Sequence, residues 1–468
     1  MTRNLSLTIL LILSTLSAFA QEQTLTSLIQ QDYIPGIQLV YTKGNKTKAY
    51  NIGVISKGST QKVTSNTVFE AASLSKSVFS YIVLKLYDRG VIDLDKPLLQ
   101  YVGTYNRFDP NDPRYGKITA RMVMEHHTGL PNWGNDKGAK LIFTPDSTFS
   151  YSGEGFQYLQ YVVEKLTGKQ LNDLAQQEVF TPLGMNSSSY QWVSKFDTVA
   201  AFGNSAEAVN RHKNQNAAYS LLTNAHDYTL FLQALLKGEG LKPATHKIMF
   251  EKMSDGNWFG HDVTEANNHI GWGLGVGLMQ NETGKWIWHW GDNGPFKCFY
   301  IALPDRKESL VYFTYNDLGL MIMPDVLTEF FGKQTWWTAK WLSYDFQSPD
   351  AMRAYRAQLQ KRGFDNAEAI YNDLTTKQAG FKLSEKDLND LGYLLMGNGQ
   401  TKQAAEIFKL NVKQHADSAN AYDSLAEAYE NLGEKEQAII NYKKSFELNP
   451  KNDNAAEHIK KLEGEAKN

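Results

Sequence analysis

The hydrophobic pattern divides the chain into a mixed part and a helical part. Short runs rich in β-branched and aromatic residues are typical of strands, and they occur at residues 37–41, 49–52, 271–279, 286–290, 296–303 and 310–315. Between the second and third runs the pattern is largely helical, with glycine and proline breaks. We therefore expect one sheet built from both ends of this part, an inserted helical region, and a closing helix at residues 325–331.

Strand patterns stop after Ser348-Pro349, and the rest of the chain carries an internal repeat. Four positions recur 34 residues later, which is the tetratricopeptide period: Leu391 as Leu425, Gly399 as Gly433, Ala404 as Ala438 and Phe408 as Tyr442. A degenerate unit at residues 352–379 precedes them, and residues 454–462 form a capping helix in this interpretation. The pattern predicts an all-α tetratricopeptide solenoid, which suits a peptide or protein partner.

Residues 1–20 have the pattern of a secretory signal peptide. Arg3 precedes an apolar run at residues 5–16, and Ala18-Phe19-Ala20 is a small-residue cleavage motif. A transmembrane anchor fits less well, because the run is shorter than about 20 residues and contains Ser and Thr. We expect cleavage after Ala20 and a periplasmic or secreted protein, with no later membrane span.

Composition limits the remaining possibilities. A chain of 468 residues predicts two or more domains, which we place at 21–345 (mixed) and 350–468 (repeats), after the signal peptide at 1–20. The net charge of −2 provides no basic surface for nucleic acid. The single cysteine, Cys298, lies in a strand-like run and is expected to be a buried structural thiol.

Ser73-Leu74-Ser75-Lys76 is the strongest chemical signal. A Ser and a Lys three residues apart meet on one helical face, and the apolar run at residues 78–83 predicts that helix. A free Ser hydroxyl is a weak nucleophile that needs an adjacent base. A buried Lys has a lowered pKa and can be that base. The same spacing also arises by chance on ordinary helix surfaces.

Two later segments carry compatible chemistry. Tyr151 lies between small residues before a helical run, so its phenol can shuttle protons beside the nucleophile. We expect a nearby cationic Lys to lower the pKa of this phenol. Residues 288–294 (WHWGDNG) form a strand that ends in glycine, where a substrate backbone can approach and an N–H can complete an oxyanion hole. A hydrogen-bonded loop tyrosine and a plain core strand are the alternatives.

Together these segments resemble the serine β-lactamase-like hydrolases, which include class C β-lactamases, D-alanyl-D-alanine carboxypeptidases, D-aminopeptidases and related esterases. Ser73-x-x-Lys76 matches the nucleophile motif. Tyr151-Ser152-Gly153 matches the Y-x-N position, and His289-Trp290-Gly291 matches K-T-G in its H-x-G form. Supporting matches lie at residues 34–36, 90–95, 127–131 and 181–185. The resemblance covers about residues 25–340 and implies an α+β fold, an antiparallel sheet flanked by helices.

The resemblance also implies roles for individual residues. Ser73 would attack a carbonyl and form an acyl-enzyme, and Lys76 and Tyr151 would share the general-base and general-acid work. The N–H groups of Ser73 and of Asp292, which follows Gly291, would form the oxyanion hole. His289 would orient the proton network or the substrate.

Two departures from the family pattern bear on the substrate. Gly153 replaces an Asn that contacts the substrate amide, and leaves space in its place. His289 replaces a Lys that contacts the carboxylate of β-lactams. We therefore expect action on esters, or on cell-wall-type peptides and amides containing D-residues. The alternatives are a class C-like β-lactamase and a catalytically retired scaffold that binds peptides through its repeats.

No cofactor or metal site is expected from the sequence. His126 and His127 are adjacent, so they point apart on any regular element, and no further ligands stand at a suitable spacing. The glycine-rich residues 271–277 fit neither a dinucleotide nor a phosphate loop, and we interpret them as a strand. Five aromatic residues either line an acyl pocket or pack in the core: Trp133, Trp258, Phe259, Trp272 and Trp290.

Overall fold

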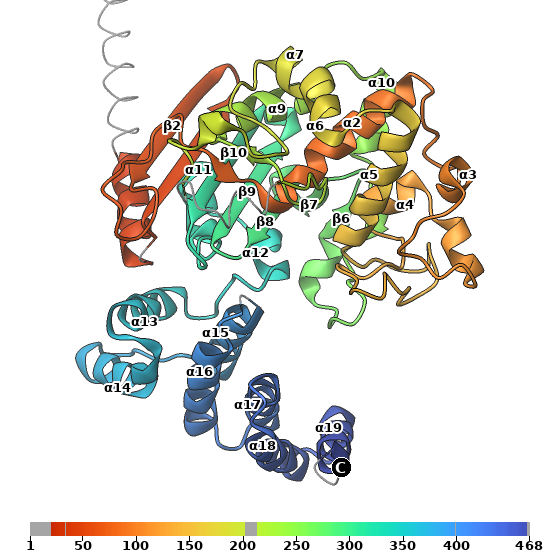
Figure 1. Cartoon of the computed structure of the whole chain (residues 1–468). Coiled ribbons are helices and arrows are strands. Elements are labelled where there is room, and N and C mark those ends of the chain that lie inside the picture. The colour runs from red at the N-terminus through yellow and green to blue at the C-terminus, as the bar shows by residue number, and fades with distance from the viewer. Residues whose placement is uncertain (1–19, 33, 202–212, 398, 466–468) are drawn as a thin grey trace, which may run out of the picture. The chain divides into compact units, whose positions relative to one another are not determined.

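The computed structural model describes residues 20–32, 34–201, 213–397 and 399–465 (Figure 1). Nearly all of the predicted signal peptide therefore lies outside the described residues. The chain forms two compact units. One contains Ile34–Trp341 and the described residues before Gln31, and the other contains Gln31, Asp32 and the described residues from Leu342 onward. Among the described helices, none has the length and apolar character needed to cross a membrane.

The first unit is built on an eight-stranded antiparallel sheet in the order β2-β1-β10-β9-β8-β7-β6-β5. Its strands come from both ends of the unit, which confirms the predicted arrangement. Their bounds are β1 Gly36–Lys43, β2 Lys46–Gly53, β5 Ser254–Asp255, β6 Ile270–Trp272, β7 Gly277–Asn281, β8 Gly284–Asn293, β9 Phe296–Leu303 and β10 Glu308–Tyr315.

The predicted single strand at residues 271–279 is wrong, because the chain turns back on itself there. Trp272 and Gly277 are paired residues of an antiparallel hairpin between β6 and β7. Gly275 in the connecting turn has φ +81°, and a Cβ at this position would lie 2.0 Å from Ser80 Oγ. A glycine-rich run that appears continuous in sequence is thus a tight turn packed against the helix that carries Ser80.

Helices cover the sheet and fill the insertion between β2 and β6 (Figure 1). They are α2 Ser75–Asp88, α3 Leu99–Val102, α4 Ala120–Met124, α5 Gly153–Thr167, α6 Leu171–Ala175, α7 Thr181–Leu183, α9 Ala225–Lys237, α10 Pro243–Met249, α11 Met323–Phe331 and α12 Trp337–Trp341. A small second sheet pairs β3 (Phe69–Glu70) with β4 (Leu222–Thr223). The inserted helical region and the closing helix match the expectation.

Successive side chains of each strand point to opposite faces of the sheet, and both faces are packed against helices. On one face Tyr300 and Phe313 join the main core with α2, α5 and α9. On the other face Tyr41 and Trp286 make ring contacts with Phe331 of α11 at 5.5 and 5.0 Å between centroids. A sheet that is buried on both sides is a rigid platform, and its central strands bring distant segments to the α2 face.

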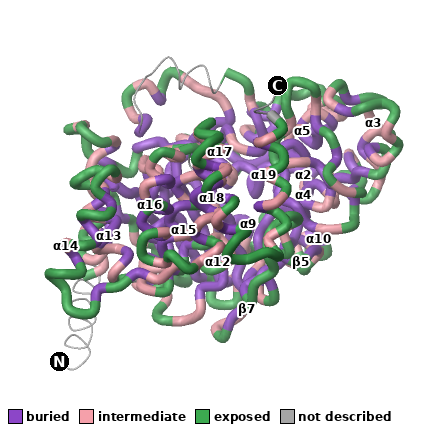
Figure 2. Tube along the Cα trace, turned by 90° about the horizontal axis from the view of Figure 1, so that it is seen from below, coloured by how far each residue is buried: buried purple, intermediate pink, exposed green. Residues whose placement is uncertain are grey.

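The second unit consists of helices α13 Pro349–Arg362, α14 Ala367–Lys377, α15 Glu385–Gly397, α16 Thr401–Gln414, α17 Ala419–Asn431, α18 Lys435–Leu448 and α19 Asp453–Glu465. Each of these helices contains both buried and exposed residues (Figure 2). The repeated apolar positions are buried, and the repeated glycines Gly399 and Gly433 have φ +74° and +78° in the turns. The predicted all-α repeat is confirmed, and its period reflects core contacts and left-handed turns.

A buried ion pair within the second unit predicts a large stability effect. The Arg356 guanidinium donates to Asp32 Oδ1 from Nη2 at 2.7 Å, and both side chains are at most 4% exposed. Replacing Arg356 by leucine should destabilise this unit by about 3–5 kcal/mol, because Asp32 is left buried without its cation. Urea unfolding followed by helical circular dichroism measures the change.

A matched control lies on the same helix, α13. Arg362 pairs with Asp373 at 2.7 Å, but both side chains are substantially exposed. Arg362→Leu should therefore have little effect on unfolding. Equal destabilisation by the two variants would contradict a special role for the buried pair.

Candidate active site

Ser73 lies in a single 3-10 turn, η1 (Ala72–Leu74), directly before α2. This agrees with the expected place near a helix N-terminus. Ala72 has φ +44°, an unusual conformation for a non-glycine residue, so the turn that presents Ser73 is strained. Ser73 is partly exposed, whereas Ser75 and Ser77 on either side of Lys76 are buried. The motif therefore presents one hydroxyl to solvent.

Lys76 contacts that hydroxyl from inside the protein. Its Nζ donates to Ser73 Oγ at 3.1 Å and to the Ala218 carbonyl at 2.8 Å, and the side chain is buried. Burial lowers the pKa of Lys76 well below its ordinary value. The lowered pKa favours a neutral amine, which can accept the Ser73 proton along the existing contact.

Tyr151 lies over the same lysine, two residues before the start of α5. Lys76 Nζ is 4.8 Å from the centre of its ring. The expected lowering of the Tyr151 pKa is wrong: burial raises it, and the nearby Ser73 side chain offsets only part of that rise. The physical reason is that the same burial disfavours the cation on Lys76 that would have stabilised a phenolate. Tyr151 is thus a protonated donor, and its buried hydroxyl has no partner of normal hydrogen-bond geometry among the described residues.

Gly291 in β8 lets the sheet approach the nucleophile turn. A Cβ at this position would lie 2.3 Å from Cys298 Sγ and 2.7 Å from the Ala71 carbonyl oxygen. We expected the glycine to admit a substrate, but the space belongs to the backbone just before Ser73. Cys298 is buried, as expected, and its Sγ contacts the Ala71 carbonyl at 3.1 Å.

Asp292 directly follows Gly291, and Ser73 lies two residues after Ala71 on the other side of this contact. Its carboxylate is partly exposed and pairs with the fully buried Lys297 ammonium at 2.5 Å. Next to it, Asn293 Nδ2 donates to Glu70 Oε2 at 2.8 Å. The second bond fixes the end of β8 to Glu70 of β3, three residues before Ser73.

His289 is completely buried between Tyr151 and the sheet. Its Nδ1 lies 2.7 Å from the Trp290 carbonyl oxygen and so carries the proton, while Nε2 has no partner among the described residues. Burial and Lys76 lower the pKa of His289 to about 3. A neutral, inaccessible imidazole offers no positive charge to a substrate carboxylate.

His126 is a site neighbour that the sequence did not identify. Its ring packs against the Tyr151 ring at 4.3 Å between centroids and an interplanar angle of 34°, and its Nδ1 accepts the Ser152 N–H at 3.0 Å. Burial lowers the pKa of His126 well below its ordinary value, so it is neutral. We expected packing or loop hydrogen bonding for this histidine, and the sequence had no signal for its position against Tyr151, 25 residues later.

Gly153 does not leave an open space, contrary to the expectation. A Cβ at Gly153 would lie 2.6 Å from the Trp133 ring, which is 46% exposed and meets Tyr219 edge-to-face at 5.6 Å. The N–H groups of Gly153 and Glu154 both donate to the Asn132 carbonyl, so the loop before Trp133 is fixed to the start of α5. An indole therefore occupies the region that a side chain at 153 would enter.

The other aromatic residues divide between core and site. Trp272 is fully buried and belongs to the core. Trp258 and Trp290 are partly exposed and lie 5.7 and 4.8 Å from the Tyr151 ring centre, while Phe259 is 48% exposed. Burial therefore excludes Trp272 from lining an acyl pocket, whereas Trp258 and Trp290 are partly exposed beside Tyr151.

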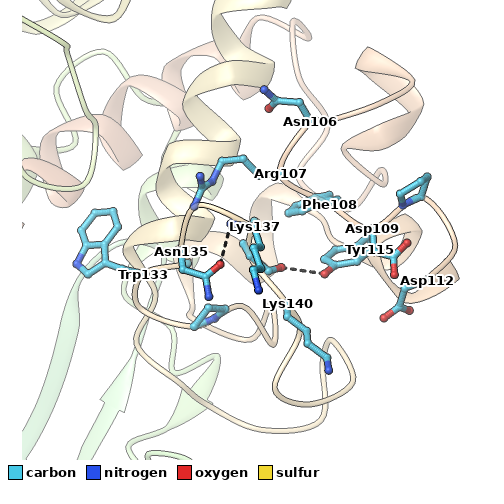
Figure 3. Close-up of a pocket in the computed structure, with 15 residues that line it drawn as sticks. Asn106, Arg107, Phe108, Asp109, Asp112, Tyr115, Trp133, Asn135, Lys137 and Lys140 are labelled. Carbon is cyan, nitrogen blue, oxygen red and sulfur yellow. Dashed lines mark hydrogen bonds between the residues drawn. The ribbon is translucent and has the colours of Figure 1, made fainter.

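A polar pocket of about 820 Å³ adjoins the site at Trp133 (Figure 3). Arg107, Tyr115, Lys137 and Lys140 are among the residues that line it, and Ser73 is not. Arg107 forms a two-pronged ion pair with Glu154, in which Nη2 lies 2.9 Å from Oε2. The pocket is therefore linked to the first turn of α5 but lies outside the Ser73 centre.

Comparison with known proteins identifies the family. The beta-lactamase family model matches residues 22–323, more than half of the chain, and a tetratricopeptide repeat model matches residues 419–452. The chain belongs to the beta-lactamase family, and its C-terminal unit contains a tetratricopeptide repeat.

Individual relatives are distant. Penicillin-binding protein 4 of Amycolatopsis lactamdurans is 25% identical over 36% of this chain and 48% of its own length. Lovastatin esterase of Penicillium rubens is 24% identical over 56% of this chain and 82% of its own. A class C beta-lactamase structure superposes with a TM-score of 0.56 at 18% identity, over 67% of this chain and 95% of that one, which shows the fold. The chain spans between 37% and 48% of the length of the first three curated relatives.

Proposed function

We propose that this protein is an exported serine hydrolase that works through an acyl-enzyme. The observation that carries the proposal is the contact between the buried Lys76 Nζ and the Oγ of the partly exposed Ser73, at 3.1 Å. A nucleophile and a base in direct contact, with a pKa shifted by burial, are what acyl transfer needs. A scaffold without catalytic activity would not need a desolvated lysine in contact with a serine.

The proposed steps use these residues in turn. Ser73 Oγ attacks the substrate carbonyl and transfers its proton to the neutral Lys76 Nζ. The N–H groups of Ser73 and Asp292 hold the oxyanion. The leaving group departs with a proton, either directly from the Lys76 ammonium or from the Tyr151 hydroxyl, which the Lys76 ammonium then reprotonates. Either route restores the neutral amine and leaves an acyl ester on Ser73. Water then repeats the sequence, with the amine as base, and releases the acid.

Esters and D-residue amides are the proposed substrates, ahead of β-lactams. The neutral His289 gives no cation for the β-lactam carboxylate, and Trp133 fills the space beside Gly153. Relatives named as a D-alanyl-D-alanine-carboxypeptidase/endopeptidase of Escherichia coli and as a lovastatin esterase support both substrate classes. Export rests on the signal-peptide pattern of residues 1–20, and the repeats are proposed to bind a peptide or protein.

A class C-like β-lactamase is the second candidate, because a protein of that class shares the fold. The test is a comparison of kcat/KM for nitrocefin, p-nitrophenyl acetate and a D-alanyl anilide. We expect the ester or anilide to be preferred. Efficient nitrocefin hydrolysis, well above the other two, would establish the β-lactamase instead. Absence of both turnover and fluorophosphonate labelling would establish the scaffold.

Gly153→Asn is expected to impair ester hydrolysis without improving nitrocefin hydrolysis. Its Cβ would meet the Trp133 ring at 2.6 Å, so the indole must move before an amide can face a substrate. With Trp133→Ala added, the asparagine gains room. The nitrocefin-to-ester ratio of kcat/KM should then rise about ten- to a hundredfold, the value of one hydrogen bond to a polar substrate group. Trp133→Ala alone is the control, and a full shift from Gly153→Asn alone would contradict the steric argument.

A further inference from the structure

A second polar cluster lies directly behind the loop of His126. Glu125, His127 and Asp146 each bring one potential ligand atom, and these atoms all lie within 4.8 Å of one another. Glu125 ends α4, and Asp146 is held to the same loop by its N–H, which donates to the His127 carbonyl at 2.8 Å. The sequence could not reveal this cluster, because Asp146 is 19 residues beyond His127 and only the fold brings it back.

Glu125 has an unusual environment for a carboxylate. It is 5% exposed, and its side chain has no hydrogen-bond or ion-pair partner among the described residues. The nearest cation on its own helix, Arg121, binds Asp95 through two N–H groups at 2.5 and 2.8 Å. A buried carboxylate without a partner is strongly disfavoured unless a cation or a proton joins it.

The second ligand is already oriented toward the third. His127 Nδ1 lies 3.6 Å from Asp146 Oδ1, and the His127 side chain is mostly buried while Asp146 is exposed. One buried carboxylate, one mostly buried imidazole and one exposed carboxylate thus bring their ligand atoms within 4.8 Å of one another.

We propose that Glu125, His127 and Asp146 bind a divalent transition-metal ion, with Zn²⁺ as the preferred ion. Zn²⁺ accepts nitrogen and oxygen ligands at about 2.0–2.2 Å and is commonly held by three protein ligands and a water. Ligand atoms around such an ion lie at most about 4.4 Å apart, so the cluster needs only a small closure. The imidazole disfavours Ca²⁺ and Mg²⁺, which prefer oxygen ligands, and Zn²⁺ binds such sites more tightly than Mn²⁺.

The ion would stabilise the loop that positions Tyr151. His126 lies between the two ligands Glu125 and His127, and it accepts the Ser150 and Ser152 N–H groups at 2.9 and 3.0 Å. Those two residues flank Tyr151. An ion here therefore acts on the position of the phenol through the backbone, and it does not contact the substrate.

The test is zinc binding by the full-length, untagged protein after EDTA treatment and dialysis. Isothermal titration and metal analysis should give one equivalent of Zn²⁺, together with a rise in Tm that grows with zinc concentration. Glu125→Gln and Asp146→Asn should each weaken binding at least tenfold, and Mg²⁺ and Ca²⁺ should bind at least tenfold more weakly than Zn²⁺. The matched control is His226→Gln, because His226 and Asp227 form a similar pair at 3.5 Å outside this cluster.

Several results would overturn the site. Among them are no zinc binding by the unaltered protein, unchanged zinc affinity in Asp146→Asn, and tighter binding of Mg²⁺ than of Zn²⁺. Asp146→Asn decides the matter if Glu125→Gln fails to fold, since Asp146 is exposed. The same titration in a Ser73→Ala background separates this site from the proposed hydrolase, because zinc binding should persist there.

Discussion

Replacing Ser73 by alanine is expected to abolish acylation by a fluorophosphonate probe and to reduce ester hydrolysis by about 10³-fold or more. Ser73 is the hydroxyl in this motif that is both partly exposed and in contact with Lys76. Ser75 Oγ instead donates to the Ala72 carbonyl at 2.5 Å, and Ser77 Oγ to the Gly275 carbonyl at 2.9 Å. Neither hydroxyl can replace the nucleophile. Intact-mass spectrometry of the probe-treated proteins measures the adduct.

Ser80→Ala is the matched control for this experiment. Ser80 is buried on the same helix, and its Oγ has no hydrogen-bond partner among the described residues, so its removal disturbs neither the fold nor the site. This variant should be labelled like the unaltered protein. Equal labelling of Ser73→Ala would show that another residue is the nucleophile.

The sequence predicted those parts of the fold that depend on local pattern. The run at residues 296–303 is β9, with the same bounds, because every residue in it is buried and favours a strand. The repeat period located the C-terminal helices, since each repeated apolar position packs in the same way. The spacing of Ser73 and Lys76 predicted their contact, because three residues make almost one helical turn.

The features that the sequence did not predict depend on contacts between distant segments. Trp133 approaches Gly153 across a loop, and Asp32 meets Arg356 from 324 residues away. The pKa of Tyr151 was predicted in the wrong direction for a related reason. Proximity to a lysine can be inferred from a motif, but the degree of burial that makes the lysine neutral can be known only from the packed structure.

Burial also assigns different roles to the two titratable groups beside Ser73. It lowers the pKa of Lys76 and raises that of Tyr151, so the amine is the base and the phenol the proton donor. His289, with a pKa of about 3, does not change charge near neutral pH. Of these groups beside Ser73, Lys76 is therefore the one whose lowered pKa can give the activity a pH dependence on the acid side.

Lys76→Met is expected to lower kcat/KM for esters by about 10²–10⁴, the usual contribution of a positioned acid–base group. Methionine fills much of the lysine volume and suits its contacts with the Tyr151 and Phe156 rings, so the fold should persist. In the unaltered protein, activity should fall as the pH drops through the lowered pKa of Lys76, because only the neutral amine accepts a proton. The residual activity of Lys76→Met should lack this acid limb.

Two comparisons make this result specific. Lys85→Met removes another partly buried lysine of α2, which donates to the Glu178 carbonyl at 2.6 Å, and it should keep both the rate and the acid limb. Tyr151→Phe should lower the rate yet retain the acid limb, because its phenol stays protonated throughout that range. An acid limb that persists in Lys76→Met and disappears in Tyr151→Phe would reverse the two roles, and the base would then be the phenol.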